Sequence, residues 1–235
     1  MNNRSDSPIK SAEVVSLNVG QPIVVEHRNK EVRTGIYKMP IADGVYLSSL
    51  NFEGDGQADL EHHGGKDKAV CVYPSEHFAH WEQVLGVQLN PGAFGENVTT
   101  KGILESQICI GDVFRLGESY VQVSQPRQPC FKLSVKYNLP ALPLLVQTTG
   151  YTGYYFRVLQ EGFVHAEAGL VLEERQQDAV TISYANTIMH QDKKNIEGME
   201  RILALPSLSA SWRKTFAKRL QGEVTDTAAR LSGKE

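Results

Sequence analysis

The stretch of sequence that decides the fold reads YVQVSQPRQPCFKL and covers residues 120–133. Its first five residues alternate apolar and polar side chains, which predicts a β-strand. Each of the two prolines fixes its own φ angle and pushes the preceding residue toward extended geometry, so we expect a rigid, exposed turn after the strand. Cys130 ends this turn, three residues after Arg127. A nearby guanidinium favours the thiolate, which is the form that attacks or binds metal, so the turn is the candidate chemical centre. A purely structural cysteine is the alternative.

Short strand-like segments separated by glycine turns surround this stretch. The predicted strands span residues 12–18, 31–37, 45–50, 68–73, 108–116 and 120–125. Many short strands with glycine turns are typical of a closed or partly closed β-barrel. We therefore predict a mainly β fold, with a barrel domain over residues 11–175. Two helices interrupt it, one from Phe78 to a stop at Gly86 and one from Leu142 to a stop before Gly150.

Helical periodicity replaces strand alternation over residues 176–235. Apolar side chains recur at helical spacing around residues 182–188, 196–203 and 208–220, which predicts a small three-helix bundle. Ser207 is the predicted cap of the last helix. That helix carries four cations, Arg213, Lys214, Lys218 and Arg219. They suit either a solvated helix end, which we favour, or contacts to nucleic-acid phosphates.

Composition narrows the class of protein. The 235 residues are 41% hydrophobic and 22% charged, as in an ordinary globular protein, and the net charge of -3 argues against a dedicated nucleic-acid binder. The sequence shows neither a signal-peptide stretch nor a membrane-spanning one, and three cysteines cannot all pair, so we expect a cytoplasmic protein without a disulfide framework. Phosphate-binding loops, dinucleotide-binding glycine motifs, serine-hydrolase elbows and paired-cysteine zinc motifs are absent from the sequence.

The other thiols and two histidines have simpler interpretations. Cys71 and Cys109 lie in apolar, strand-like runs and are predicted to be small core residues. His77 and His80 have the i, i+3 spacing of metal ligands, but the neighbouring sequence offers no third ligand. Packing or solvent-facing histidines are therefore the preferred interpretation.

Three polar segments have the composition of a ligand site. Gly64 and Gly65 allow close approach of the backbone to an anion, and the adjacent His63 can relay a proton. Asn97 supplies a hydrogen-bonding amide, and Lys38 precedes a proline where strand alternation ends. Ordinary surface turns and a solvated lysine remain the alternatives for these segments.

Taken in order, these segments resemble the MOSC family, which is named for the C-terminal domain of molybdenum cofactor sulfurase. The resemblance covers roughly residues 11–175 and rests on Lys38 and on the runs at residues 54–59, 63–70, 94–97, 111–112 and 125–130. The C-terminal helices look like the three-helix domain of one bacterial branch. Members of that branch protect cells against N-hydroxylated bases such as hydroxylaminopurine.

The resemblance implies a β-barrel that binds the molybdenum–pterin cofactor in a cleft. In eukaryotic amidoxime-reducing relatives the matching cysteine ligates molybdenum, so the resemblance makes Cys130 the metal ligand and a catalytic residue. The other implied site residues are Arg127 and Lys38 at the cofactor phosphate, His63 as proton relay, and Asn97, Gly64 and Gly65 along the pocket. The long barrel insertion of the eukaryotic relatives is not evident here, so their detailed cofactor contacts do not transfer.

The implied activity is reduction of an N-hydroxylated small molecule to the amine. The sequence has no recognisable flavin or iron–sulfur motif, so the electrons are expected from a separate flavoprotein or iron–sulfur reductase. A sulfur carrier with a Cys130 persulfide is one alternative, and a cofactor- or nucleic-acid-binding protein without catalysis is another. The C-terminal helices are predicted to dock the electron donor or to form a homodimer interface. No membrane partner is expected.

Overall fold

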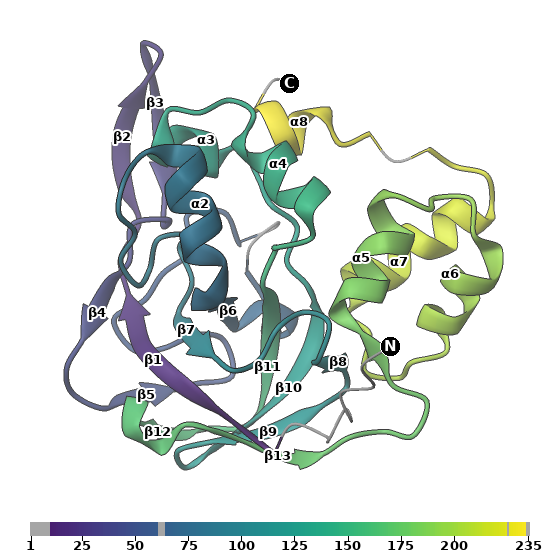
Figure 1. Ribbon diagram of the computed structural model, residues 1–235, viewed down its shortest axis with the longest axis horizontal. Coiled ribbons are helices and arrows are strands. Elements are labelled where there is room, and N and C mark those ends of the chain that lie inside the picture. Colours follow the sequence, from purple (N-terminus) through teal and green to yellow (C-terminus); the bar gives the residue numbers. More distant parts are fainter. Residues whose placement is uncertain (1–9, 61–63, 225, 234–235) are drawn as a thin grey trace, which may run out of the picture.

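The computed structural model describes residues 10–60, 64–224 and 226–233 (Figure 1). Its main sheet contains strands β1 Ser11–Val19, β4 Met39–Ile41, β6 Val70–Pro74, β7 Val98–Lys101, β9 Val113–Leu116, β10 Ser119–Pro126, β11 Tyr154–Gln160 and β13 Leu170–Glu174. Three two-stranded pairs are β2 Ile23–His27 with β3 Lys30–Thr34, β5 Val45–Leu47 with β12 Gly162–Val164, and β8 Cys109–Ile110 with β14 Val180–Thr181.

The main sheet closes on itself. Within the described residues, seven strands follow the order β13-β9-β10-β11-β6-β7-β1, and β13 pairs back onto β1. Neighbouring strands are antiparallel except for β6 and β7, which are parallel. Closure leaves these strands without a free edge, and β4 continues from β1 as a short extension. The predicted β-barrel with helices and a C-terminal helical bundle is confirmed.

Several predicted strands have different limits. The strand predicted over residues 45–50 ends at Leu47, and the one predicted over residues 68–73 begins at Val70. The segment predicted over residues 108–116 is two strands, β8 and β9, because Gly111 has a φ of 94° and the Asp112 carboxylate accepts a hydrogen bond from the Cys109 N–H at 2.8 Å. The strand predicted to reach residue 37 ends at Thr34. There the Thr34 hydroxyl accepts the Ile36 N–H at 3.2 Å, in place of a partner strand.

The helices are α2 Phe78–Leu85, α3 Lys132–Tyr137, α4 Leu142–Thr149, α5 Ile182–His190, α6 Ile196–Leu203, α7 Ala210–Leu220 and α8 Ala228–Ser232, with single 3₁₀ turns at Lys66–Lys68, Ser75–His77 and Ala166–Ala168. The predicted helices α2 and α4 end at left-handed glycines, Gly86 and Gly150. Prediction missed α3 and α8, which are too short to show helical periodicity. Among the helices of the described residues, none combines the length and the apolar character needed to cross a membrane.

The C-terminal helices pack on the barrel and share its hydrophobic core. Ile182, Ile188 and Trp212 belong to the same buried cluster as the barrel residues Phe114 and Phe156. Pairing of β14 with β8 and a hydrogen bond from the α7 N-cap to the end of β10 complete the junction. The chain after α7 then crosses back, and α8 lies beside α3 and α4 (Figure 1).

The N-cap of α7 lies two residues after the predicted one. Ser209, not Ser207, precedes the first helical residue, and its hydroxyl accepts the Trp212 N–H at 3.3 Å. The prediction of Ser207 was wrong because residues 205–208 form turns that delay the helix start.

Replacing the true cap is expected to destabilise the protein. Ser209→Ala should lower the free energy of unfolding by about 1 kcal/mol, because a helix N–H loses its acceptor. Urea unfolding of Ser209→Ala beside Ser207→Ala measures this. An equal or larger loss for Ser207→Ala would contradict the assignment of the cap.

Candidate active site

The turn that carries Cys130 joins the end of β10 to the start of α3. Cys130 is only 8% exposed and Arg127 only 7%, so the expectation of an exposed turn was wrong. The Arg127 N–H donates to the Gly153 carbonyl at 3.0 Å, and the Phe131 N–H donates to the Arg230 carbonyl at 2.8 Å. The groups that cover the turn come from Gly153, just before β11, and from α8. These segments are far from the turn in sequence, so the local pattern could not predict that the turn is buried.

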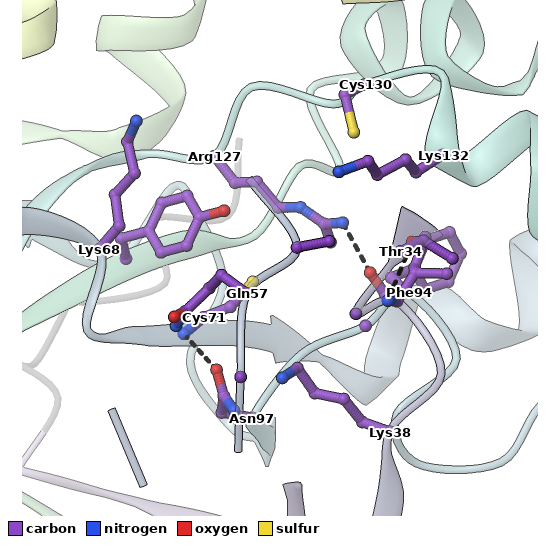
Figure 2. Close-up of a pocket in the computed structure, with 16 residues that line it drawn as sticks. Thr34, Lys38, Gln57, Lys68, Cys71, Phe94, Asn97, Arg127, Cys130 and Lys132 are labelled. Atoms are coloured by element: carbon purple, nitrogen blue, oxygen red, sulfur yellow. Dashed lines mark hydrogen bonds between the residues drawn. The ribbon is translucent and has the colours of Figure 1, made fainter. Parts of the chain in front are cut away.

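Cys130 lines an inner pocket that opens between the barrel and this turn (Figure 2). Four of the predicted site residues meet there: Lys38, Asn97, Arg127 and Cys130. Cys71 lines the same pocket, beneath the Arg127 side chain. Tertiary structure therefore brings together groups that are more than 90 residues apart in the chain.

Arg127 is a buried cation with an unused donor. One terminal nitrogen, Nη2, donates to the Phe94 carbonyl at 2.6 Å, while Nη1 is buried and has no hydrogen-bond partner among the described residues. Burial by itself would lower the pKa of Arg127, but the nearby acidic groups of Cys71, Tyr155, Cys130 and Glu96 raise it overall. A permanently charged guanidinium with a free N–H in a pocket suits an anion such as phosphate.

Lys38 and Asn97 are connected through Asp55. The buried Asp55 carboxylate forms an ion pair with the Lys38 ammonium and accepts a hydrogen bond from Asn97 Nδ2 at 2.9 Å. Asn97 Oδ1 in turn accepts the Cys71 N–H at 3.1 Å. The sequence alone did not identify Asp55 as a site residue. Its only distinguishing feature is its position between two glycines in the run at residues 54–59.

A loop that leads into β7 forms part of the pocket wall. The Glu96 carboxylate accepts the N–H groups of Gly92 at 2.8 Å and Phe94 at 2.9 Å, and burial raises the pKa of Glu96. Gly95 has a φ of 75°, and a Cβ atom there would lie 2.8 Å from the Ile36 side chain. Glycine at this position therefore lets the loop pack close to Ile36, with the neighbouring Phe94 carbonyl within reach of Arg127.

Cys71 lies on β6, as the apolar run predicted, and is buried. Burial raises the pKa of its thiol, and Arg127 opposes this only in part. Cys71 is therefore a protonated second thiol beside the candidate centre. A strand that is apolar on both faces does not show in its sequence which side chain faces a pocket.

The glycine-rich segment leads into residues that contact the C-terminal helices. Gly64 and Gly65 are not among the residues that line the inner pocket, and His63 lies outside the described residues. Asp67 accepts the Ala210 N–H at 2.9 Å and pairs with Arg157 at 2.8 Å. The segment thus ties the barrel to the first turn of α7.

His77 is a packing residue. Its ring stacks on Tyr151 at a centroid distance of 3.9 Å, and its Nε2 lies 2.7 Å from the Glu105 carboxylate, while His80 is exposed. Across residues 10–60, 64–224 and 226–233, no cluster of three or more His, Cys, Asp or Glu side chains can hold a metal ion. The packing of His77 and the exposure of His80 agree with the preferred interpretation.

Three of the four cations predicted on the last helix of the bundle have partners within the protein. Arg213 donates to the carbonyls of Leu203 and Leu205, and Arg219 donates to the Met189 carbonyl. Lys218 pairs with Glu223 at 3.0 Å. These contacts stabilise the helix ends of the bundle.

A wider outer cleft of about 950 Å³ continues from the inner pocket. Cys130, Lys68, Lys132 and Tyr155 line both spaces. The far wall belongs to α5, α7 and α8, and it includes His190, Arg219 and Arg230. The C-terminal helices therefore form part of the candidate site, which the sequence did not indicate.

His190 makes stability depend on pH. Burial, then the charges of Arg230, Arg219 and Lys193, lower the pKa of His190 to about 3. The unfolded chain takes up this proton near pH 6.5, so between pH 6.5 and 3 the unfolded state binds more protons and stability falls as pH falls. From pH 7 to 4.5, we expect the wild type to lose about 2 kcal/mol more than His190→Gln.

Urea unfolding at the two pH values measures this difference. His80→Gln, at an exposed histidine on α2, is the matched control and should behave as the wild type does. Equal pH slopes for the wild type and His190→Gln would refute the assignment.

Comparison with known proteins identifies a family for each of two segments of the chain. Residues 59–170 match the family described as MOSC domain, and residues 180–223 match the one described as YiiM-like, 3-alpha helix domain. Uncharacterized protein YflK of Bacillus subtilis is 53% identical over 206 residues, which cover 88% of this chain and 93% of that protein. Protein YiiM of Escherichia coli is 39% identical over 205 residues, covering 86% and 91%.

A solved structure and a more distant relative are also similar to this chain. The crystal structure of YiiM from Geobacillus stearothermophilus aligns with a TM-score of 0.76 and 45% identity, over 89% of this chain and 99% of that one. A protein of Gibberella moniliformis named Reductase is 33% identical over 149 residues, 62% of this chain but only 26% of that protein. The chain belongs to the MOSC family, in the group that carries a YiiM-like three-helix domain.

Proposed function

We propose that this protein is a molybdenum-cofactor-dependent reductase that converts N-hydroxylated compounds, including N-hydroxylated nucleobases, to the amines. One observation carries the proposal: Cys130 lines the same pocket as the buried Arg127, whose Nη1 has no hydrogen-bond partner among the described residues. Family membership and the name of the Gibberella relative agree with redox chemistry, although that name describes a much longer protein.

The residues present fit a cofactor that combines a soft-ligand metal with a phosphate. A thiolate suits molybdenum, and a guanidinium donor without a partner suits a phosphate oxygen. The inner pocket holds only about 80 Å³, far less than a pterin needs, but it continues into the outer cleft past Cys130 and Lys132. A ligand held at Cys130 can therefore extend toward the C-terminal helices.

In this mechanism, the role of the chain's own residues is to bind and orient the cofactor. When bound, the cofactor supplies the two-electron reduction of the N–O bond. Cys130 would hold the metal, Arg127 the phosphate, and the Asp55–Lys38 pair would keep the pocket floor rigid. The N–O bond breaks, two protons and two electrons are consumed, and the amine and water are the products. The electrons come from a separate flavoprotein or iron–sulfur reductase, and His63 remains the predicted proton relay.

Cytoplasmic location is part of the proposal, and it is supported by three free thiols in the structure.

Metal analysis and turnover test the proposal directly. The protein should be expressed in a host that makes the cofactor, then assayed for molybdenum and pterin per chain and for conversion of 6-hydroxylaminopurine to adenine with a supplied reductase. We expect near-stoichiometric metal and formation of the amine. Absence of metal, pterin and turnover would overturn it, and one added sulfur on Cys130 in that protein would favour the sulfur-carrier alternative.

A further inference from the structure

We infer that Arg230, on the C-terminal helix α8, is the positioning residue for Cys130. The inference rests on the proposed function only in taking Cys130 as the functional thiol. Arg230 contacts the residues on both sides of Cys130: its Nη1 donates to the Pro129 carbonyl, and its own carbonyl accepts the Phe131 N–H at 2.8 Å. One residue therefore holds the backbone before and after the cysteine.

The guanidinium is itself fixed in place. Its Nη2 donates to Gln147 Oε1 on α4 at 2.7 Å, so the two donor nitrogens join the Cys130 turn to a neighbouring helix. Arg230 is half-buried, and this partial burial lowers its pKa. Arg230 also lines the outer cleft next to Cys130. Arginine suits this task because its planar fork donates in two fixed directions, which a lysine cannot do.

The way α8 is attached argues for positioning rather than for core packing. None of the described residues of α8 is buried, so the helix adds little to the hydrophobic core. Arg230 instead joins α8 to the Cys130 turn and to Gln147 through hydrogen bonds. Gly233, which follows α8, lies against the Phe131 ring, where a Cβ atom would come within 2.8 Å. The C-terminal segment thus holds the thiol at the junction of the two pockets.

The test measures alkylation of Cys130 by iodoacetamide in cofactor-free protein, with each cysteine quantified by peptide mass spectrometry. Arg230→Gln should raise the Cys130 rate by about tenfold, because a hydrogen bond from a charged group is lost and the turn opens more often. Arg230→Lys should give an intermediate rate, since one ammonium can reach only one of the two acceptors. Gln147→Ala removes one partner of the guanidinium but leaves the guanidinium itself in place. The alkylation rate of Cys130 should therefore again be intermediate.

Arg219→Gln is the matched control, because Arg219 lines the same cleft and donates to a carbonyl but does not contact the Cys130 turn. It should leave the Cys130 rate unchanged, and Cys71 should stay slow in all variants. An unchanged rate in Arg230→Gln, or an equal rise at Cys71 with a lower melting temperature, would overturn the inference. Because no cofactor is used, failure of the reductase proposal appears separately, as a wild type without molybdenum or turnover.

Discussion

Cys130→Ser is expected to abolish reductase activity and metal retention together. A serine hydroxyl is a hard, protonated group at neutral pH, whereas the proposed site needs a soft thiolate ligand for molybdenum. Removing a residue that only supports a metal ligand lowers metal affinity or activity by about tenfold to a hundredfold. Loss of the ligand itself should therefore lower activity by more than about a hundredfold. Molybdenum per chain and the rate of amine formation, measured on the same preparations, give the result.

Cys71→Ser is the matched control within the same pocket. Burial raises the pKa of the Cys71 thiol, so it stays protonated and is not expected to ligate the metal. This variant should keep most of its molybdenum, and Cys109→Ser, outside the pocket, should keep all of it. Full metal and turnover in Cys130→Ser, or equal losses in Cys71→Ser, would show that Cys130 is not the ligand.

The second large effect is expected on stability. Asp55→Ala should lower the free energy of unfolding by about 3–5 kcal/mol, because it leaves the buried Lys38 ammonium without its partner. The substitution also removes the acceptor for Asn97 Nδ2 and for the Gly20 N–H. Urea unfolding with an unchanged m value measures the loss.

Two comparisons isolate the buried pair. The double variant Asp55→Ala, Lys38→Met should be more stable than Asp55→Ala alone, since no unpaired charge is then buried. Glu173→Ala breaks the half-exposed pair with Arg115 and should cost less than about 1 kcal/mol. If Asp55→Ala costs no more than Glu173→Ala, the pair does not stabilise the pocket floor.

Prediction from the sequence succeeded where the information is local. Strand alternation and glycine turns predicted the barrel, and helical spacing predicted α2, α4 and the three C-terminal helices. The order of the polar segments indicated the family. Prediction failed at boundaries set by single contacts, as at Ser209 and Asp112, and it missed α8, whose five residues carry no periodic signal.

What the sequence by itself determined is the fold class, the family and the cysteine turn, because these depend on periodicity and on residue types close together in the chain. Only the tertiary structure decided the environment of that turn. Closure of the barrel brings Cys71 and Asn97 into one pocket with Arg127, and Asn97 is held there by Asp55. The C-terminal segment returns to place Arg230 against the neighbours of Cys130. Burial and charge pairing arise from contacts between distant segments, and no local pattern of residues encodes them.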